Sequence, residues 1–296
     1  MGHDHSHHEF GSTKKLYLAV VINIILTVFQ IVGGLLSGSL SLLADALHNF
    51  SDAGALAIAA VAARIAKIPP NQRMTYGYKR AEILGALINS TTLIIVGLYL
   101  LYEAVNRYFD QNPIDGWTVV WVAAIALVID IFTALLTYSG SKDSVNIKAA
   151  FIHNVSDAAA SVVVIISGIL IINFQIYVID LVATVLISLY VLYQAFTLIR
   201  QCILVLMQST PTHLDVDEIK KSIEGVHLVK EAHHIHVWQL DDKKVLLEGH
   251  IVVEEQDLPA LEKIKMEIRQ SLRNKFAINH STLEFETSLE CMNSGN

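Results

Sequence analysis

Six stretches of mostly apolar residues, each about 20 residues or longer, follow one another between residues 16 and 206. A helix of that length can cross a bilayer, because each residue adds 1.5 Å and the hydrocarbon core is about 30 Å thick. In lipid the backbone must satisfy its own hydrogen bonds, which a helix does within one segment. The pattern therefore predicts an all-α, six-helix transmembrane domain with helices over residues 16–36, 40–65, 81–102, 117–138, 147–172 and 177–206.

Composition divides the chain into regions. Charged residues make up only 17% of the sequence, against about 25% in a soluble protein, and the deficit falls on the apolar part. We expect a His-containing N-terminal tail (1–15), the transmembrane domain (16–208), a second domain (209–290) and a short tail (291–296). The polar N-terminus predicts no cleavable signal peptide, and the two cysteines predict no disulfide framework. The net charge of -7 indicates no nucleic-acid partner.

Lys and Arg are concentrated in alternate connections between the predicted helices. With a cytoplasmic N-terminus, the outer loops hold only Arg107. The cytoplasmic segments then hold Lys14, Lys15, Arg64, Lys67, Arg73, Lys79, Arg80, Lys142, Lys148 and Arg200. Cytoplasmic loops normally carry the excess of Lys and Arg. We therefore expect both termini in the cytoplasm and, in a prokaryotic cell, a multi-pass location in the cell (inner) membrane.

One pentapeptide pattern occurs twice inside the apolar spans, as HNFSD at 48–52 and HNVSD at 153–157. Each places a His four residues before an Asp, so the two side chains share one helix face. Ionisable residues within a membrane are costly and are functional-site candidates by default. From the helix rise, both pairs lie near the middle of the bilayer, although their helices run in opposite directions. If the helices are neighbours, one site can form from His48, Asp52, His153 and Asp157.

The ligand types in this site indicate a transition metal. Two imidazoles and two carboxylates suit a borderline divalent ion in tetrahedral geometry, and zinc is the natural fit. No thiolate is offered for Cu(I), and magnesium and calcium prefer all-oxygen shells; cobalt, nickel and cadmium remain open. The same groups bind protons, so protons and metal compete for them, which is a mechanism for antiport. The alternative is two buried His–Asp hydrogen bonds that hold helices together.

Other polar residues also lie within the spans. Asp45 precedes His48 by three residues and shares its helix face. Asp45 and Asp130 are interpreted either as partners of the site and its access path or as structural hydrogen-bonding groups. For Asn23 and Asn89, a structural hydrogen bond between helices is the favoured interpretation.

Residues 209–296 have the composition of a soluble domain. Asp215 is a helix N-cap and Gly225 a helix end. Residues 234–239 and 245–253 read as strands, Asp257 caps a second helix, and residues 281–286 read as a last strand. The order αββαβ predicts an α+β domain with its helices on one face of a small sheet.

This domain is rich in histidine. His234 and His236 are expected to share a strand face because Ile235 and Val237 alternate with them. With His250 and Glu286 they form a candidate second metal site; the alternative is a set of surface histidines. His3, His5, His7 and His8 form an N-terminal tract that either captures metal or has little role.

Taken together, the six spans, the two His-x-x-x-Asp pairs, the sequence TYGYKRAE at 75–82 and the αββαβ order resemble the cation diffusion facilitator family, most of all its zinc-transporting branch. The resemblance implies a homodimer in the lipid bilayer that exports zinc from the cytoplasm in exchange for protons, with cadmium or cobalt as secondary substrates. It also implies a metallochaperone-like cytoplasmic domain that binds a structural or regulatory Zn²⁺ and stabilises the dimer.

Carried over to this sequence, the transport ligands are His48, Asp52, His153 and Asp157. The cytoplasmic ligands map best onto His234, His250 and Glu286, with His233 and His280 as further candidates, because adjacent histidines leave the register ambiguous. The alternatives to a transporter are a membrane metalloenzyme and a membrane-bound zinc sensor. A metalloenzyme normally keeps an open metal position beside a general base, and a membrane-bound zinc sensor needs a signalling module. Neither feature is evident, so we expect a transporter and not an enzyme.

Overall fold

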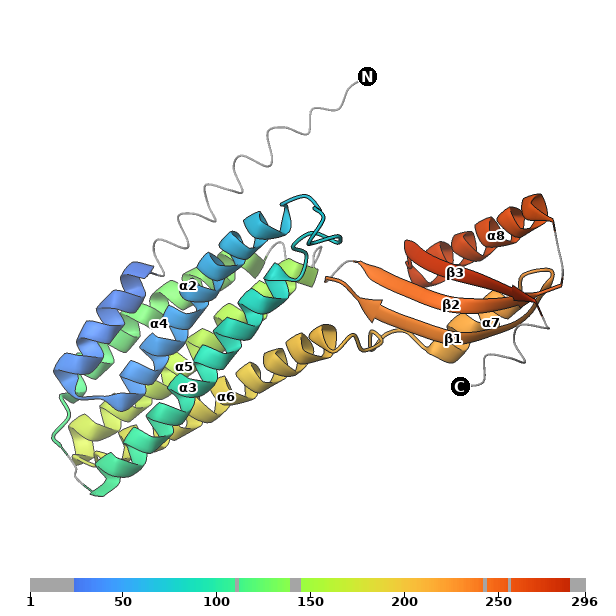
Figure 1. The fold of residues 1–296 in the computed structure, drawn as a ribbon. Helices are drawn as coiled ribbons and strands as arrows, with labels where there is room; N and C mark the ends of the chain where they lie inside the picture. The colour runs from blue at the N-terminus through green and yellow to red at the C-terminus, as the bar shows by residue number, and fades with distance from the viewer. Residues whose placement is uncertain (1–23, 110–111, 139–144, 242–243, 255–256, 288–296) are drawn as a thin grey trace. The chain divides into compact units, whose positions relative to one another are not determined.

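The computed structural model describes residues 24–109, 112–138, 145–241, 244–254 and 257–287, shown as coloured ribbon in Figure 1. Within these residues a set of long helices precedes a smaller domain of helices and strands. The predicted N-terminal tail with its histidine tract, the first part of the first span with Asn23, and the tail at 291–296 lie outside the described residues.

Five of the described helices are long and apolar enough to cross a membrane. They are α2 (Leu40–Ala66), α3 (Ala81–Phe109), α4 (Gly116–Tyr138), α5 (Val145–Phe174) and α6 (Val178–Leu206). A shorter apolar helix, Ile24–Ser37, occupies the second part of the first predicted span. The predicted spans agree with these bounds to within a few residues, except that α3 continues past residue 102. There Glu103 and Arg107 form an ion pair of 3.0 Å one turn apart, which supports the helix beyond its apolar run.

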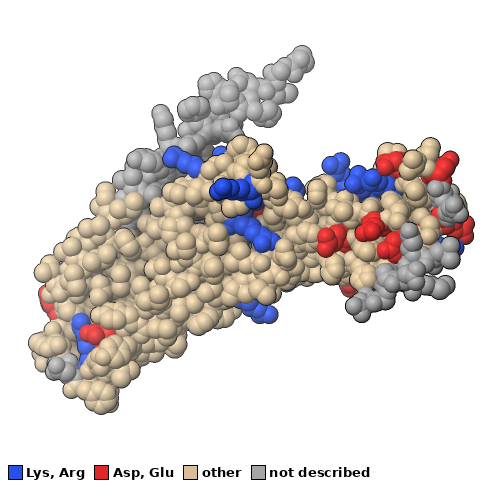
Figure 2. Space-filling view, viewed as in Figure 1, with Lys and Arg blue, Asp and Glu red and all other residues tan. Residues whose placement is uncertain are grey.

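The long helices share one apolar core. It draws Leu42 from α2, Leu93 from α3, Val119 from α4, Val164 from α5 and Val191 from α6. Large apolar side chains on the outward faces remain exposed, including Tyr99 and Tyr193. On the face seen in Figure 2, the helices show few charged side chains, whereas the domain that follows carries both signs. An apolar exterior around a packed interior is what a membrane-spanning bundle requires.

Close approach between α4 and α5 depends on glycine. A Cβ at Gly168 of α5 would lie 2.8 Å from a methyl group of Val120 and 3.2 Å from the backbone oxygen of Gly116. Side chains at these positions would therefore push the two helices apart. Small residues at such crossings let membrane helices pack backbone to backbone.

The start of α2 is held by a carboxylate from α6. Asp180 is fully buried and accepts hydrogen bonds from the hydroxyl groups of Ser39 and Ser41, both at 2.6 Å, and from the N–H groups of Leu40, at 2.7 Å, and Ser41, at 3.3 Å. A negative charge at a helix N-terminus satisfies free N–H groups and complements the helix dipole. These hydrogen bonds hold the N-terminal end of α2, the helix that carries His48, against α6.

The C-terminal domain has the predicted αββαβ order. Its elements are α7 (Val216–Glu224), β1 (Val229–Gln239), β2 (Val245–Val253), α8 (Leu258–Phe276) and β3 (His280–Thr287). The sheet order is β1-β2-β3, with β1 antiparallel and β3 parallel to β2. β1 begins at Val229 and not at the predicted 234, because its first residues include the polar pair Lys230 and Glu231, which hides the strand pattern.

Both helices of this domain cover the same face of the sheet (Figure 1). Asp215 caps α7 by accepting the N–H of Asp217, and Asp257 caps α8 by accepting the N–H of Ala260. Ile223 of α7 and Ile268 of α8 join Ile251 of β2 in one buried cluster. Since side chains alternate along a strand, the neighbours of Ile251 on β2 point to the opposite face, and His250 is one of them.

Candidate metal sites

The two pentapeptides meet between α2 and α5. His48 Nε2 lies 3.6 Å from Asp52 Oδ2 and 3.3 Å from Asp157 Oδ1. His153 Nε2 lies 3.4 Å from Asp52 Oδ2 and 3.5 Å from Asp157 Oδ2. One ligand atom from each of the four residues falls within 4.8 Å of all the others. We call this group the intramembrane cluster: His48, Asp52, His153 and Asp157.

The atoms of the intramembrane cluster converge without satisfying one another. Within the described part of the chain, both ring nitrogens of His48, Oδ2 of Asp52 and Oδ1 of Asp157 are buried and have no hydrogen-bond partner. Hydrogen bonds of this kind span about 2.7–3.2 Å, shorter than the separations here. This geometry disfavours the alternative of two structural His–Asp hydrogen bonds. Buried polar atoms left without partners call for an explanation such as a bound ion.

Accessibility differs within the cluster. The side chains of His48 and Asp157 are 5% and 10% exposed, whereas those of Asp52 and His153 are 30% and 39% exposed. Asp52 lies nearer the end of α2 and His153 nearer the start of α5, so the exposed pair belongs to one end of the bundle. Tyr190 of α6 packs edge-on against the His48 ring at 6.5 Å between centroids.

Other intramembrane polar residues pair across helices. Asn89 of α3 accepts a hydrogen bond from Ser51 of α2 at 3.3 Å, as the structural interpretation of Asn89 predicts. Asp45 accepts a hydrogen bond from Gln30 at 2.7 Å. Asp45 and Asp130 both contact Ser161, at 3.4 and 3.1 Å. These two carboxyl groups therefore belong to a network beside the intramembrane cluster.

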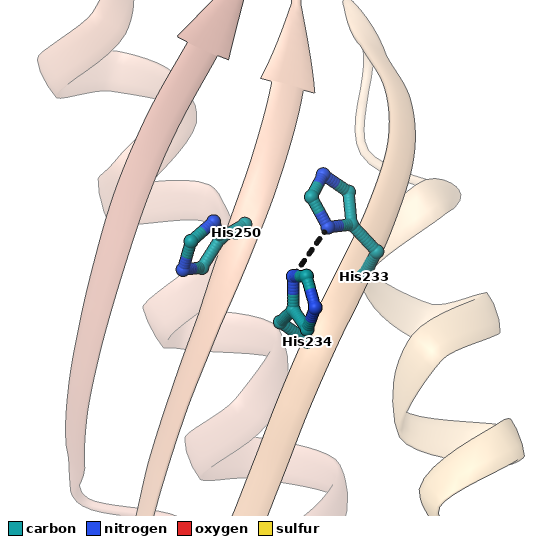
Figure 3. Close-up of side chains that lie close together, drawn as sticks. All are labelled: His233, His234 and His250. Carbon is teal, nitrogen blue, oxygen red and sulfur yellow. Dashed lines mark hydrogen bonds between the residues drawn. The ribbon is translucent and has the colours of Figure 1, made fainter. Parts of the chain in front are cut away.

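A second group of histidines lies on the sheet. The rings of His233 and His234 from β1 and of His250 from β2 face one another (Figure 3), and their ligand nitrogens fall within 4.8 Å. Glu286 of β3 contacts two of them: its Oε2 lies 3.1 Å from His233 Nε2, and its Oε1 is hydrogen-bonded to His250 Nδ1. We call this group the sheet cluster: His233, His234, His250 and Glu286.

A bulge in β1 creates the sheet cluster. The register with β2 shifts between His233 and His236, so two residues of β1 oppose Gly249 alone. His234 takes a left-handed backbone conformation with φ of 48°, as the first residue of one bulge type does. The extra residue brings His234 beside His233 while Ile235 still packs toward the core.

Two predicted candidates lie outside the sheet cluster, and the bulge accounts for the first of them. His234 and His236 were expected to share a site, but His236 pairs with Glu248 further along the strand, and His233 takes the place beside His234. His280 opposes Leu246 at the other end of β2 from His250 and is not in the cluster. The adjacent histidines at 233 and 234 are the sequence feature that indicates His233 as a ligand. Regular strand alternation instead pairs His234 with His236, which the bulge separates.

Electrostatics in the sheet cluster favour an ionised carboxylate. Burial would raise the pKa of Glu286, but the hydrogen bond and positive charge of His250, followed by those of His233, outweigh burial and hold the pKa below its ordinary range. His250 Nε2 also lies 3.6 Å from Glu284. Three imidazoles and one carboxylate form a donor set that fits tetrahedral zinc.

Comparison with known proteins gives consistent matches over nearly the whole chain. A family model described as the cation efflux transmembrane domain matches residues 16–207, and one described as the cation efflux protein, cytoplasmic domain, matches residues 211–288. Zinc transporter ZitB of Pectobacterium atrosepticum is 36% identical over 97% of this chain and 89% of the relative. The cadmium, cobalt and zinc/H(+)-K(+) antiporter of Bacillus subtilis is 34% identical over 97% and 92%.

A solved structure matches a quarter of the chain. It is the metal-bound C-terminal domain of the CzcD transporter from Cupriavidus metallidurans, with 36% identity. The match covers 25% of this chain and 99% of that one, with a TM-score of 0.23.

Proposed function

Because the chain belongs to the cation efflux family, also called the cation diffusion facilitators, we propose that it exports zinc from the cytoplasm in exchange for protons. The family makes it a multi-pass membrane transporter of metal cations and not an enzyme. The observation that carries the finer proposal is the intramembrane cluster, which combines four metal-ligand side chains from two apolar helices.

The ligand set supports zinc as the transported ion. Two imidazoles and two carboxylates suit zinc, with cadmium or cobalt as secondary substrates. The names of both relatives include zinc, and that of the Bacillus subtilis relative adds cadmium and cobalt. Since metal binding needs neutral imidazoles and ionised carboxylates, a proton that binds a ligand weakens the site for metal.

Competition of this kind couples metal export to proton uptake. The cluster holds its polar atoms without mutual hydrogen bonds, so zinc or protons must stabilise them. A site that alternates between these two occupants across the membrane exchanges one for the other. The name of the Bacillus subtilis relative also describes an antiporter that uses protons.

We assign the cytoplasm to the end of the bundle where α2 finishes and α5 begins. The positive residues of the α2–α3 connection lie at this end of the sequence spans. The more exposed members of the cluster, Asp52 and His153, lie toward the same end, which suits loading from inside. The bacterial relatives support the cell (inner) membrane as the location, and the distribution of Lys and Arg along the sequence supports both termini in the cytoplasm.

For the sheet cluster we propose a resident Zn²⁺ with a structural or regulatory role. His233, His234, His250 and Glu286 would hold it, a set that keeps the three predicted ligands and adds His233, one of the further candidates. A metal there supplies no reaction step; it would tie β1, β2 and β3 together. We further propose that the cytoplasmic domain supports a homodimer.

Zinc flux in proteoliposomes tests the transport proposal. The full-length protein is reconstituted with a zinc-responsive dye and a pH-responsive dye inside the vesicles, and a pH gradient is imposed. We expect zinc uptake to rise when the vesicle interior is acidic and the interior to become more alkaline as zinc enters. Zinc flux that ignores the gradient would exclude proton antiport.

A pair of variants tests the site. His153→Ala should abolish flux, whereas His227→Ala, which removes an exposed histidine of the cytoplasmic domain, should leave it unchanged. Equal flux in the His153→Ala variant and the unchanged protein would exclude the assigned transport site. A competition panel of zinc, cadmium, cobalt, nickel and manganese then gives the selectivity.

A further inference from the structure

Two buried carboxyl groups that are not among the proposed metal ligands share a single hydroxyl group. Asp45 lies on α2, Asp130 on α4 and Ser161 on α5. Ser161 Oγ is 3.4 Å from Asp45 Oδ2 and 3.1 Å from Asp130 Oδ2. Asp45 and Ser161 are fully buried, and Asp130 is 6% exposed. We call Asp45 and Asp130 the buried carboxyl pair.

The network is short of hydrogen atoms when both carboxyl groups are ionised. A serine hydroxyl carries one hydrogen and can donate it to one carboxylate only. The other contact becomes a hydrogen bond when the second carboxyl group carries a proton and donates it to Ser161 Oγ. Gln30 contacts the pair through Asp45, to which its Nε2 donates, while its Oε1 accepts a hydrogen bond from Asn49 at 3.0 Å.

The surroundings of Asp45 also favour a protonated carboxyl group. Oδ1 of Asp45 is buried and has no hydrogen-bond partner among the described residues. A buried, ionised carboxylate needs donors on both oxygens or a nearby positive charge. A neutral carboxyl group tolerates this environment far better, because protonation removes the charge that burial penalises.

The charges that surround the pair belong to the intramembrane cluster. Asp45 interacts electrostatically with His48 and Asp157, and Asp130 with Asp157, His153 and His48. On α2 itself, Asp52 lies one turn beyond His48. On the neighbouring helices, Ile24–Ser37 contributes the neutral Gln30, and α6 places Tyr190 against His48. The occupancy of the cluster is therefore what changes the charge around the pair.

We propose that the buried carboxyl pair is a proton-binding site distinct from the four metal ligands, which holds one proton when the intramembrane cluster is empty and releases it when zinc binds. The inference rests on the proposed transport function. A zinc ion in the cluster brings two positive charges, and these favour the ionised form of both Asp45 and Asp130. The carboxyl O–H bond breaks, the electron pair stays on the carboxylate oxygen, and water in the transport path accepts the proton.

When zinc leaves, the pair takes up a proton again and the cycle closes without net chemistry. The pair would therefore add an exchanged proton that the ligand residues alone do not account for. It would also explain why an Asp lies one helical turn before His48 and faces another Asp from α4 instead of a basic residue.

Proton release on zinc binding tests the inference. The full-length protein carries His234→Ala and His250→Ala, so that the sheet cluster does not contribute. Zinc is titrated calorimetrically in buffers of different ionisation enthalpy, which gives the number of protons released per zinc ion. Asp130→Asn and Asp45→Asn are each added to this background. Asp115→Asn, an exposed carboxylate at the start of α4, is the matched control.

We expect each of the two test variants to release about one proton fewer per zinc ion, with zinc binding retained, and the control to match the background. Unchanged proton release in both test variants would overturn the inference and leave the transport site intact. Loss of all zinc binding in the background protein would overturn the proposed function, and the inference with it.

Infrared difference spectra give a second measurement. A protonated carboxyl band should be lost on zinc addition and be absent in the variant that carries both Asp45→Asn and Asp130→Asn. A band that persists in that variant would assign the proton to another group and overturn the inference.

Discussion

The intramembrane cluster and the sheet cluster have similar ligands but hold them differently. On α2 and α5, the imidazole and carboxylate atoms stand 3.3–3.6 Å apart and several have no hydrogen-bond partner among the described residues. On the sheet, Glu286 bonds both His233 and His250, and His233 lies 3.1 Å from His234, nitrogen to nitrogen. The sheet cluster is therefore largely satisfied without an ion, whereas the intramembrane cluster requires an occupant.

This difference matches the two proposed roles. A transport site must bind its ion and release it in every cycle, so neither the zinc-bound nor the proton-bound state should be strongly preferred. A resident site gains from ligands that are already oriented by hydrogen bonds before the metal arrives. Four predictions test whether the two clusters separate in this way.

The largest effect should come from removing a transport ligand. Asp157→Ala leaves two imidazoles and one carboxylate as ligands, so zinc transport should fall by at least about 100-fold. His250→Ala removes an equivalent ligand from the sheet cluster and should leave transport within about threefold, because the ion there is not the cargo. Zinc uptake by proteoliposomes measures both. Equal losses in the two variants would contradict the separation of roles.

The next effect concerns membership of the sheet cluster. His233→Ala removes a ring that contacts both His234 and Glu286, and zinc affinity at this site should fall about 10–100-fold. His236→Ala, on the same strand but beside Glu248, should leave the affinity unchanged. Zinc titration of the full-length protein that carries Asp157→Ala isolates the site. A larger loss of zinc affinity in His236→Ala than in His233→Ala would show that His236 is the ligand, as regular strand alternation predicts.

The two clusters also differ in how far the sequence predicts them. The i, i+4 spacing on a helix fixes which side chains share a face, so His48 pairs with Asp52 whatever the surroundings. On a strand, one inserted residue changes the face of all that follow. The bulge at His234 depends on a left-handed backbone conformation, which the identity of the residue does not predict. The sequence therefore favours His234 over His233 as a metal ligand.

In the fold, too, features that depend on nearby residues could be predicted, whereas contacts between distant residues could not. Apolar length predicted α4 and α6 closely, because the bilayer sets the length of a spanning helix. The αββαβ order followed from caps such as Asp215 and Asp257, which act within a few residues. The hydrogen bonds of Asp180 to the start of α2 join residues about 140 positions apart, and no local pattern reveals such a contact.

The Asp180 anchor allows a test that separates the clusters by their dependence on helix placement. Asp180→Ala leaves the hydroxyl groups of Ser39 and Ser41 and the N–H of Leu40 without their buried acceptor, a loss of about 2 kcal/mol in stability. Transport should fall, while zinc affinity at the sheet cluster stays the same. Thermal unfolding and zinc uptake measure the first effects, and zinc titration measures the second. Asp115→Asn, at an exposed helix start, is the control and should change little.

The smallest effect is a pH dependence confined to the sheet cluster. The pKa of Glu286 is lower in the folded domain than in an unfolded chain, because His250 and His233 outweigh the effect of burial. The ionised group therefore stabilises the fold above about pH 4.3, and this contribution is lost as the pH falls below that value. Hydrogen exchange of β2 and β3 in the full-length protein should quicken over that range, and Glu286→Gln should remove the extra dependence. Glu262→Gln, an exposed change on α8, should retain it, whereas identical profiles for the two variants would show that the carboxylate is not held by the histidines.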